Sequence, residues 1–175
     1  MKDKDEVRKE LKKIRFSFSG EERKKADEKI LKTFLKEFGG YESYFIYNSF
    51  SSEADTKAII DGLLRAEKRV YLPKIAGDYM VAVPYGKTKK GFLGIDEPIG
   101  QPFEGDIDIT VIPLLAINKN FFRIGYGKGF YDRYLKGRKT KKIGLGYSFQ
   151  QVDFIEDSWD EPLDIFLCEK GVFNK

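Results

Sequence analysis

A stretch of ten residues with three alternating glycines, RIGYGKGFYD at 123–132, constrains the fold more than any other part of the chain. The glycines are Gly125, Gly127 and Gly129. They follow an apolar segment and precede a helical pattern. Because glycine adopts positive φ angles freely, such a run lets backbone N–H groups approach a ligand closely. With Arg123 and Lys128 beside it, the run predicts a backbone cradle for an anion such as phosphate.

Two better-known glycine motifs do not match this stretch. A Walker loop requires four residues between its first Gly and a Gly-Lys-Ser/Thr ending. A Rossmann fingerprint would require Gly where Phe130 stands. A glycine-rich turn that only caps a helix is the alternative. Asp132 is predicted in the first turn of that helix, where a carboxylate can serve a phosphate-bound Mg²⁺, so the pattern favours a nucleotide site.

The residue types that are missing restrict the chemistry further. The sequence has no histidine and a single cysteine, Cys168. This excludes Ser-His-Asp and Cys-His catalysis, histidine-based zinc sites, multi-cysteine metal sites and an internal disulfide. Carboxylates, Lys, Arg, Tyr and oxygen-bound hard cations remain, a set suited to phosphoryl transfer. The length of 175 residues predicts one domain over 1–175.

Charge is distributed unevenly along the chain. Residues 119–142 hold 9 basic and 1 acidic side chains, whereas residues 150–175 hold 2 basic and 7 acidic ones. A basic segment facing an acidic tail would suit a triphosphate with its metal, although solvated surface is the commoner cause of such runs. An RNA-binding module that uses the basic segment is therefore an open alternative.

The apolar runs in the sequence are short. None approaches the ~20 residues of a membrane span, and the charged N-terminus lacks a signal-peptide core. We therefore expect a cytoplasmic protein without a membrane partner.

The N-terminal region predicts two helices. Apolar residues at helical spacing indicate an amphipathic helix over 4–18; they are Val7, Leu11, Ile14 and Phe18. Ser19 followed by Glu22 predicts a capping box for a second helix that stops at Gly39-Gly40. Its predicted buried residues are Ala26, Ile30, Phe34 and Phe38. We interpret residues 1–38 as a helical flank, on which Lys4 and Arg8, taken alone, indicate solvated charge.

After this flank, β-rich runs alternate with helical patterns. The predicted strands cover residues 44–50, 69–73, 79–85, 106–113, 142–148 and 165–168. The helical segments surround Ile59–Leu64 and residues 130–135, and Lys87–Lys90 is predicted as a polar loop. Strand 106–113 is nearly continuously apolar, which is typical of a central strand buried on both faces. The pattern predicts a single three-layer α/β/α domain with a mostly parallel, mixed sheet, Rossmann-like without the dinucleotide fingerprint.

A carboxylate follows the first predicted strand. Glu53 falls in the strand-to-helix turn, and ligands bind at the carboxyl ends of strands in open α/β sheets. Glu53 and Asn48 are therefore candidate ligand contacts. The alternative is that Glu53 or Asp55 only caps the following helix.

With these residues in place, the sequence resembles the 5-formyltetrahydrofolate cyclo-ligase family, also called 5,10-methenyltetrahydrofolate synthetases. Residues 123–132 are similar to the family's R-L-G-x-G-x-G-Y-Y-D signature, with Ile and Phe as mild variations. Supporting matches run almost end to end: Lys4-x-x-x-Arg8, Glu53-Ala54-Asp55-Thr56, Leu72-Pro73, Glu97-Pro98, Gln151, and Asp160 four residues before Asp164.

The resemblance implies an enzyme that uses ATP and Mg²⁺ to convert 5-formyltetrahydrofolate into 5,10-methenyltetrahydrofolate, with release of ADP and phosphate. Phosphorylation of the formyl oxygen would produce an iminium phosphate that N10 of the folate attacks. ATP and a reduced folate are then the expected ligands, without nucleic acid, and we expect a monomer. A divergent relative that phosphorylates another substrate is the alternative within the same fold.

The resemblance also implies roles for individual residues. The expected ATP contacts are Lys4, Arg8, Arg123, Ile124, Gly125, Tyr126, Gly127, Lys128, Gly129, Phe130 and Tyr131. Arg123 and Lys128 would be catalytic by neutralising charge in the transition state. Asp132 and Asp160 would hold Mg²⁺ directly or through water. The expected folate contacts are Asn48, Glu53, Tyr126 and Phe130. Trp159 stands where many relatives have His, and it packs either on the ligand or on the core.

Overall fold

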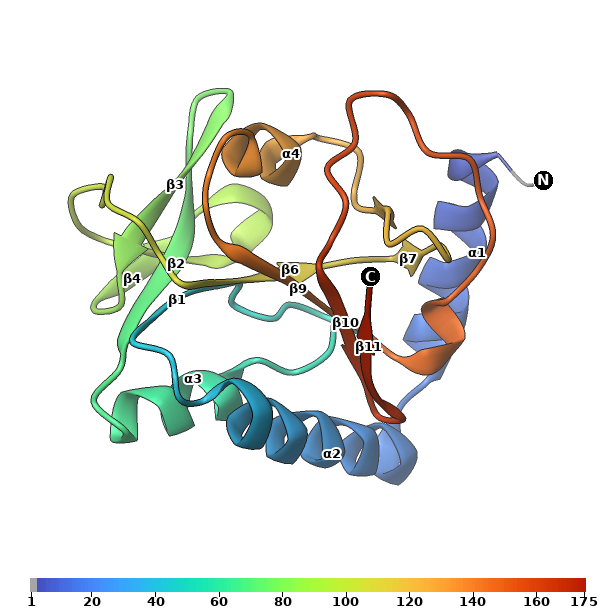
Figure 1. Cartoon of the computed structure of the whole chain (residues 1–175), viewed down its shortest axis with the longest axis horizontal. Coiled ribbons are helices and arrows are strands. Elements are labelled where there is room, and N and C mark those ends of the chain that lie inside the picture. Colours follow the sequence, from blue (N-terminus) through green and yellow to red (C-terminus); the bar gives the residue numbers. More distant parts are fainter. Residues whose placement is uncertain (1–2) are drawn as a thin grey trace.

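Strand β6 (Ile109–Pro113) lies at the centre of a seven-stranded sheet, as its apolar sequence predicts (Figure 1). The computed structural model describes residues 3–175, so the first two residues of the expected 1–38 flank lie outside the described residues. The strand order is β11-β10-β9-β6-β1-β2-β3. All four β6 side chains from Ile109 to Ile112 are buried, because helices cover both faces of the sheet.

The sheet is mixed, with a parallel centre and antiparallel edges. The parallel strands are β1 (Ser43–Ile46), β2 (Arg69–Ala76), β6, β9 (Lys141–Leu145) and β10 (Ile165–Cys168). At the two edges, β3 (Tyr79–Pro84) pairs antiparallel with β2, and β11 (Gly171–Asn174) pairs antiparallel with β10. This confirms the predicted mostly parallel, mixed sheet.

The chain changes direction across the sheet between β1 and β6. From β1 it proceeds to β2 and β3 on one side, and later from β6 to β9, β10 and β11 on the other. The two strands are paired in register, with Tyr44 opposite Ile109. In open α/β sheets, the carboxyl ends of strands at such a switch point leave a crevice in which ligands bind.

Helices cover the two faces of the sheet unequally (Figure 1). On one face, α2 (Gly20–Phe38) and α3 (Lys57–Arg65) enclose the larger part of the core, with Phe34 and Ile59 fully buried. On the opposite face, α4 (Phe130–Leu135) packs Tyr134 and Leu135 against the sheet. The architecture is therefore the predicted α/β/α arrangement.

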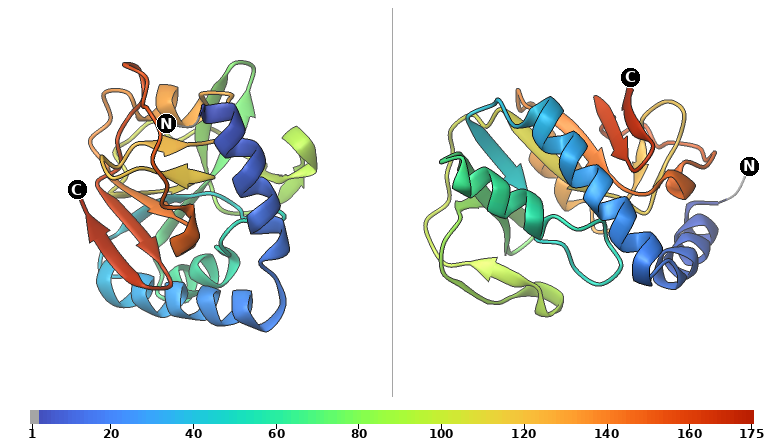
Figure 2. Two further views of the ribbon diagram at one scale, coloured as in Figure 1. Left: turned by 90° about the vertical axis from the view of Figure 1, so that its right-hand side faces the viewer. Right: turned by 90° about the horizontal axis from the view of Figure 1, so that it is seen from below.

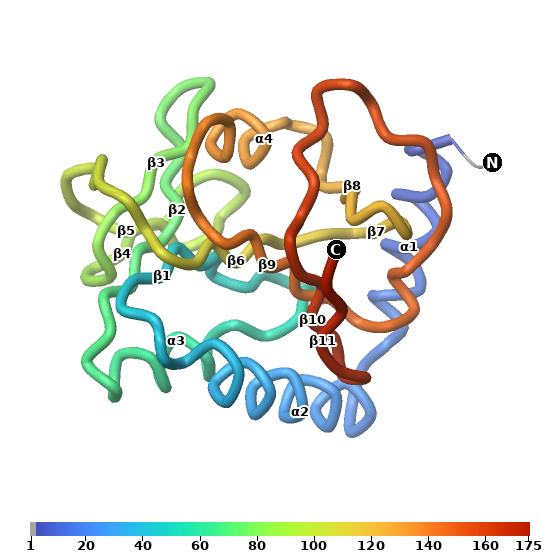
Figure 3. The backbone as a smooth tube through the Cα atoms, in the orientation of Figure 1, coloured from blue at the N-terminus to red at the C-terminus, as the bar shows by residue number. Residues whose placement is uncertain are grey.

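The N-terminal helix α1 (Lys4–Ser17) packs outside these layers. Its buried apolar side chains, Val7 and Leu11, contact a small hairpin of β7 (Ala116–Ile117) and β8 (Arg123–Ile124), together with Phe154. The left view of Figure 2 shows α1 alongside this hairpin. Figure 3 shows the segment between η2 (Ser148–Gln150) and β10 passing the same side of the molecule as α1. Helix α1 and this segment, the acidic loop of residues 151–164, thus face each other.

Four local predictions were wrong, each for a physical reason. The first strand ends at Ile46 instead of residue 50. Directly after it, Tyr47 O accepts from Thr56 Oγ1 at 2.7 Å instead of pairing with a neighbouring strand. The Ser19–Glu22 capping box does not form: Ser19 directly precedes α2, whose first residue Gly20 has φ +66°, and the Ser19 side chain makes no cap hydrogen bond.

The other two errors concern exposure and pairing. Ile14, which was predicted on the apolar face of the first helix, is 41% exposed. Arg15 lies on the buried face instead and is only 3% exposed. The polar segment at 87–90 is not a loop, since β4 (Thr88–Lys90) pairs antiparallel with β5 (Asp96–Pro98). A short 3₁₀ turn, η1 (Phe92–Gly94), connects these two strands. Strand β11 was not predicted at all. Among residues 3–175, no helix has the length and apolar content needed to cross a membrane.

Candidate active site

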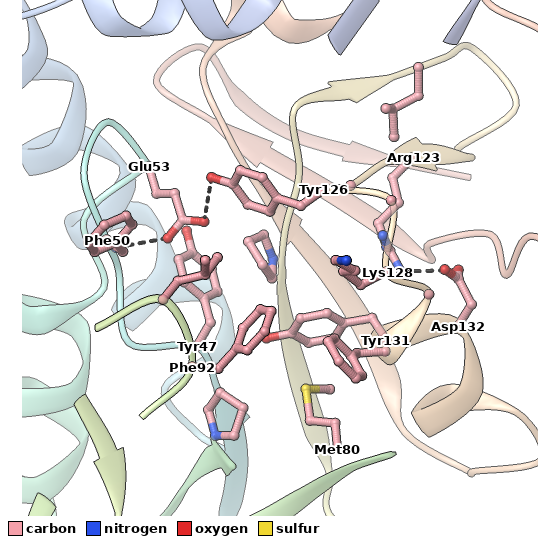
Figure 4. Close-up of a pocket in the computed structure, with 18 of the residues that line it drawn as sticks. Tyr47, Phe50, Glu53, Met80, Phe92, Arg123, Tyr126, Lys128, Tyr131 and Asp132 are labelled. Atoms are coloured by element: carbon pink, nitrogen blue, oxygen red, sulfur yellow. Dashed lines mark hydrogen bonds and ion pairs between the residues drawn. The ribbon is translucent and has the colours of Figure 1, made fainter. Parts of the chain in front are cut away.

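A cavity of about 910 Å³ lies at the carboxyl ends of β1 and β6, where the sheet topology predicts a ligand crevice. Figure 4 shows part of its wall. All of the residues expected to bind ATP, folate or metal line this cavity: Lys4, Arg8, Asn48, Glu53, residues 123–132 and Asp160. The structure therefore brings together side chains that are up to 156 positions apart in sequence.

The glycine loop between β8 and α4 needs its glycines for two different reasons. Gly127 and Gly129 have φ angles of +88° and +66°, in the region that disfavours other residues. Gly125 does not have a positive φ angle, but a Cβ atom there would lie 2.9 Å from Nη1 of Arg123. Two glycines thus provide the backbone conformation and the third leaves room for a cation.

Arg123 presents an unsatisfied donor beside this loop. Its side chain is 5% exposed, and its Nη2 donates to Asp132 Oδ1 at 3.0 Å. Its buried Nε has no hydrogen-bond partner in the described part of the chain. An unpaired buried donor costs about 1–3 kcal/mol, and because this atom is fully buried a ligand oxygen reaches it only if the surrounding side chains move.

Lys4 joins α1 to the acidic loop across the cavity. Its Nζ lies 2.7 Å from Asp157 Oδ2 and 2.6 Å from Asp160 Oδ2. Partial burial opposes the charge, but the hydrogen bonds to the two carboxylates outweigh it and raise the pKa of Lys4. Arg8, one turn along, donates from Nε to Gly125 O at 3.1 Å and pairs with Asp5. Both cations belong to the cavity, so treating them as solvated charge alone is wrong.

The two expected metal ligands are both engaged with cations. Asp132 pairs with Arg123, and Asp160 pairs with Lys4. Within residues 3–175, no cluster of three or more acidic, Cys or His side chains forms a complete metal site. Mg²⁺ commonly takes only one or two protein carboxylates and completes its shell with phosphate oxygens and water. The donors therefore fit an Mg²⁺ ion that binds together with a polyphosphate.

Glu53 is a buried carboxylate on the opposite wall (Figure 4). Its Oε1 accepts from the Tyr126 hydroxyl at 3.0 Å, and its Oε2 accepts from Phe50 N at 2.8 Å. Burial raises its pKa, which the Phe50 N–H, the charge of Arg15 and the Tyr126 hydroxyl partly offset. The interpretation of Glu53 as a helix cap is wrong, since Asp55 is the residue that accepts from Lys57 N at the helix start.

Aromatic side chains line the rest of the cavity. Phe130 packs edge-on against Phe92, with 6.0 Å between ring centroids. Asn48 lines the same space and donates to Asp96 O at 3.4 Å. Trp159 is 74% exposed and also lines the cavity, so it does not pack into the core.

Several lining residues were not predicted, among them Arg15, Lys12, Phe50, Phe92 and Asp157. Arg15 had a detectable signal, because it follows Val7 and Leu11 at steps of four on the buried stripe of α1. A cation at an apolar position of a helix indicates a buried polar contact. Phe92 had no comparable signal, since it lies outside every predicted helix and strand and outside the predicted 87–90 loop.

Comparison with known proteins assigns the chain to a family. A family model described as the 5-formyltetrahydrofolate cyclo-ligase family matches residues 1–169. The chain belongs to the 5-formyltetrahydrofolate cyclo-ligase family. This confirms the resemblance deduced from the glycine loop and its companions, and it makes the chain an enzyme of the ligase class.

Curated cyclo-ligases resemble the chain along nearly its whole length. The 5-formyltetrahydrofolate cyclo-ligase of Mycoplasma pneumoniae is 32% identical over 174 residues, covering 96% of this chain and 99% of the relative. The cyclo-ligase of Haemophilus influenzae is also 32% identical over 174 residues, covering 90% of this chain and 93% of the relative.

Two solved structures of 5,10-methenyltetrahydrofolate synthetases share the fold. The NMR structure of the Aquifex aeolicus protein superposes with a TM-score of 0.88 at 32% identity, covering 98% of this chain and 92% of the other. The Mycoplasma pneumoniae structure superposes with a TM-score of 0.80 at 29% identity, covering 96% and 99%. The likeness to these two synthetases thus extends over the whole sheet and its flanking helices.

Proposed function

We propose that this chain converts 5-formyltetrahydrofolate into 5,10-methenyltetrahydrofolate, using ATP and Mg²⁺ and releasing ADP and phosphate. It acts as a cytoplasmic monomer of one domain over residues 1–175, with the 1–38 flank contributing to the ATP site. ATP and a reduced folate are its ligands, without nucleic acid. The observation that carries the proposal is one cavity with two unlike walls: the cationic glycine loop suits phosphate, and buried Glu53 suits N–H donors.

The proposed chemistry has two balanced steps. In the first, the formyl oxygen of the folate forms a bond to the γ-phosphorus of ATP as the bond from that phosphorus to ADP breaks. In the second, N10 forms a bond to the formyl carbon, the carbon–oxygen bond breaks and phosphate leaves, and N10 releases its proton. Phosphorylation is needed because an amide-like oxygen is otherwise a poor leaving group.

The residues of the phosphate wall have distinct proposed tasks. Lys4 and Arg8 hold the ATP phosphates from α1, while the backbone of residues 124–131 cradles them. Arg123, with its unpartnered Nε, and Lys128 neutralise charge on the transferring group. Asp132 and Asp160 hold Mg²⁺ directly or through water, and that ion supplies charge neutralisation and alignment of the phosphates.

The folate wall orients the second substrate. Glu53 and Asn48 form hydrogen bonds with the ring system of the folate, and Tyr126 and Phe130 lie against it. Tyr126 belongs to the glycine loop and also contacts Glu53, so it joins the two walls. This placement supports the transfer of phosphate from one ligand to the other within the same cavity.

An absorbance assay tests the proposal directly. Purified protein with ATP, Mg²⁺ and 5-formyltetrahydrofolate is expected to produce the methenyl chromophore at a rate that depends on all three. ADP release without the chromophore would favour a relative that phosphorylates another acceptor. RNA binding with a steep salt dependence and no response to Mg²⁺-ATP would favour the RNA-binding alternative. Folded, ATP-binding protein that leaves the absorbance unchanged would contradict the proposed reaction.

A further inference from the structure

Arg15 is a buried arginine whose donors reach three separate segments. Its Nε donates to Ser52 Oγ at 3.0 Å, its Nη1 to Leu114 O at 3.1 Å, and its Nη2 to Tyr126 Oη at 2.6 Å. These partners belong to the loop after β1, the end of β6 and the glycine loop. Burying a guanidinium costs free energy unless it is well bonded, so this arrangement indicates a specific task.

The direction of the hydrogen bonds defines that task. Arg15 donates to the Tyr126 oxygen, so the Tyr126 proton is free to point at Glu53 Oε1, 3.0 Å away. Figure 4 shows the Tyr126 hydroxyl facing one oxygen of the Glu53 carboxylate, while the backbone N–H of Phe50 donates to the other oxygen. Burial and the nearby Glu53 charge raise the pKa of Tyr126 to about 12, so it remains a donor throughout the neutral range.

We propose that Arg15 is a positioning residue for the reduced folate: through the Tyr126 hydroxyl it fixes the Glu53 carboxylate as an acceptor turned toward N–H donors of the folate ring. The inference rests on the proposed function of this cavity and deepens it. Each Glu53 oxygen already accepts one bond from the protein, which fixes the carboxylate plane and leaves its remaining lone pairs for a ligand.

The other groups around Glu53 do different work. Arg23 of α2 donates to the backbone carbonyls of Ser51 and Glu53, at 3.1 and 2.7 Å, and therefore holds the loop and not the carboxylate. Tyr47 and Tyr131 also face Glu53; burial, then the Glu53 charge, raises the pKa of each well above its ordinary value, so both stay neutral. Arg15 is the cation whose hydrogen bond reaches the carboxylate through Tyr126.

A ligand-free titration separates this role from catalysis. The side-chain carboxyl carbon of Glu53 can be followed by NMR against pH in the wild type and in Arg15→Met, with Glu53→Gln used to assign the signal. Burial raises the pKa of Glu53 and the charge of Arg15 opposes this. Loss of the guanidinium is therefore expected to raise the midpoint of the Glu53 titration by about one pH unit or more. Lys13→Met removes a charge from the exposed side of the same helix and is expected to leave the midpoint in place. An unshifted midpoint in Arg15→Met overturns the inference.

Steady-state kinetics provide the second measurement. Arg15→Met is expected to raise the KM for 5-formyltetrahydrofolate about tenfold, with the KM for ATP changed by less than about twofold. The acidic limb of kcat/KM for the folate is expected to move to higher pH. Arg15→Lys, which keeps the charge but cannot donate to three partners, is expected to restore part of the loss. Equal increases in both KM values overturn the inference, because they indicate general damage to the cavity.

Tyr126→Phe keeps the proposal testable if Arg15→Met does not fold. It removes only the hydroxyl between Arg15 and Glu53, and it is expected to move the Glu53 midpoint and the folate KM in the same direction. A wild type that forms no methenyl product contradicts the proposed function, while the NMR titration still decides whether Arg15 controls Glu53. An active wild type with an unmoved midpoint refutes the positioning role alone.

Discussion

Arg123 shows at the scale of one residue how the site is prepared for an anion. The guanidinium is almost fully buried, yet one carboxylate, Asp132, neutralises it from outside the glycine loop. The Nε atom that has no partner is a donor that water does not reach. The charge of the guanidinium, which the ion pair with Asp132 holds in place, is the feature that can stabilise charge developing on a transferring phosphoryl group.

Asp132→Asn tests the proposed metal role. The amide keeps the shape and can still accept from Arg123, but it binds Mg²⁺ poorly, so we expect kcat to fall about 100-fold or more. Loss of the ion pair is expected to reduce the free energy of unfolding by about 1–2 kcal/mol, which urea denaturation measures. Asp153→Asn, on the exposed surface of the acidic loop, is the matched control. Wild-type turnover by Asp132→Asn would exclude Asp132 as a metal ligand.

Gly127→Ala separates backbone strain from ligand approach. Gly127 has φ +88°, and an alanine there is expected to cost about 1–2 kcal/mol of stability and to raise the KM for ATP about tenfold. Gly137 is a matched control because it has φ +75°, has open space around its Cβ position and lies outside the cavity. Thermal unfolding should show similar losses in both variants, with normal ATP kinetics only in Gly137→Ala. An unchanged KM in Gly127→Ala would argue against the cradle.

The sequence was informative about residues that belong to a local pattern. The glycine loop and its cations could be predicted because their chemistry is contained in ten consecutive positions. Arg15 was missed because apolar periodicity favoured Ile14, whereas three hydrogen bonds from distant segments favour the arginine inside. The ion pairs of Asp132 with Arg123 and of Asp160 with Lys4 could not be predicted from local sequence either. They depend on how the glycine loop, the acidic loop and α1 pack together.

At the scale of elements, a polar staple joins the starts of β1 and β6. Asp108 Oδ2 accepts from Ser43 N and Ser43 Oγ, both at 2.9 Å, and from Glu42 N at 3.1 Å. The Asp108 N–H in turn donates to Ser43 Oγ. The slight burial of Asp108 opposes its ionisation, but the hydrogen bonds from Ser43 and Glu42 outweigh this and lower its pKa. The staple fixes the two strands whose opposite ends form the cavity.

Asp108→Ala is expected to lower the free energy of unfolding by about 1 kcal/mol at pH 7, a small value because the carboxylate is largely exposed. A folded-state pKa below the unfolded value near 3.9 means that the stabilisation is present above that pH and is lost as pH falls through the folded value. Urea titrations of wild type and variant at neutral and acidic pH measure this. A difference in stability that stays constant down to pH 3 would contradict the role of the charge.

Element types were predicted better than element ends. The central strand and the burial stripe of α2 follow from apolar periodicity, which acts locally. The end of β1 could not be predicted, because it depends on Thr56, which lies ten positions beyond Ile46. The Thr56 hydroxyl donates to Tyr47 O and accepts from Ser49 N, in place of hydrogen bonds to a neighbouring strand. The β4–β5 pair was missed because most of its residues are polar and only β4 is exposed throughout, so neither strand shows an apolar alternation. Strand pairing, the Lys90–Asp96 ion pair and the burial of Glu97 and Pro98 hold it in place.

At the scale of the whole molecule, the two ends of the sequence meet at the cavity. Lys4 near the start bonds to Asp157 and Asp160 near the end, and Phe154 packs with Val7 and Leu11. The hydrophobic contacts hold α1 in place, while the ion pairs lie at the phosphate wall. A ligand that competes for Lys4 therefore acts on both segments at once.

Hydrogen exchange is expected to report this coupling. ATP with Mg²⁺ should slow amide exchange in the first turns of α1 and in residues 157–160 together, since both contact the same phosphates in the proposed complex. Lys4→Met should weaken the protection of both segments by a similar factor. Protection confined to the glycine loop would contradict a shared role. The free enzyme and a mixture with Mg²⁺ alone provide the baselines.

The exposed position of Trp159 makes it an intrinsic optical reporter. It is the single tryptophan of the chain, it is 74% exposed, and it lines the cavity beside Asp160. Fluorescence excited selectively at the indole therefore comes from one known place, without any label. We expect its emission to shift as ATP or folate displaces water from the ring, and the signal should vanish in Trp159→Phe. An emission spectrum that ignores saturating ligands would place both of them away from that wall.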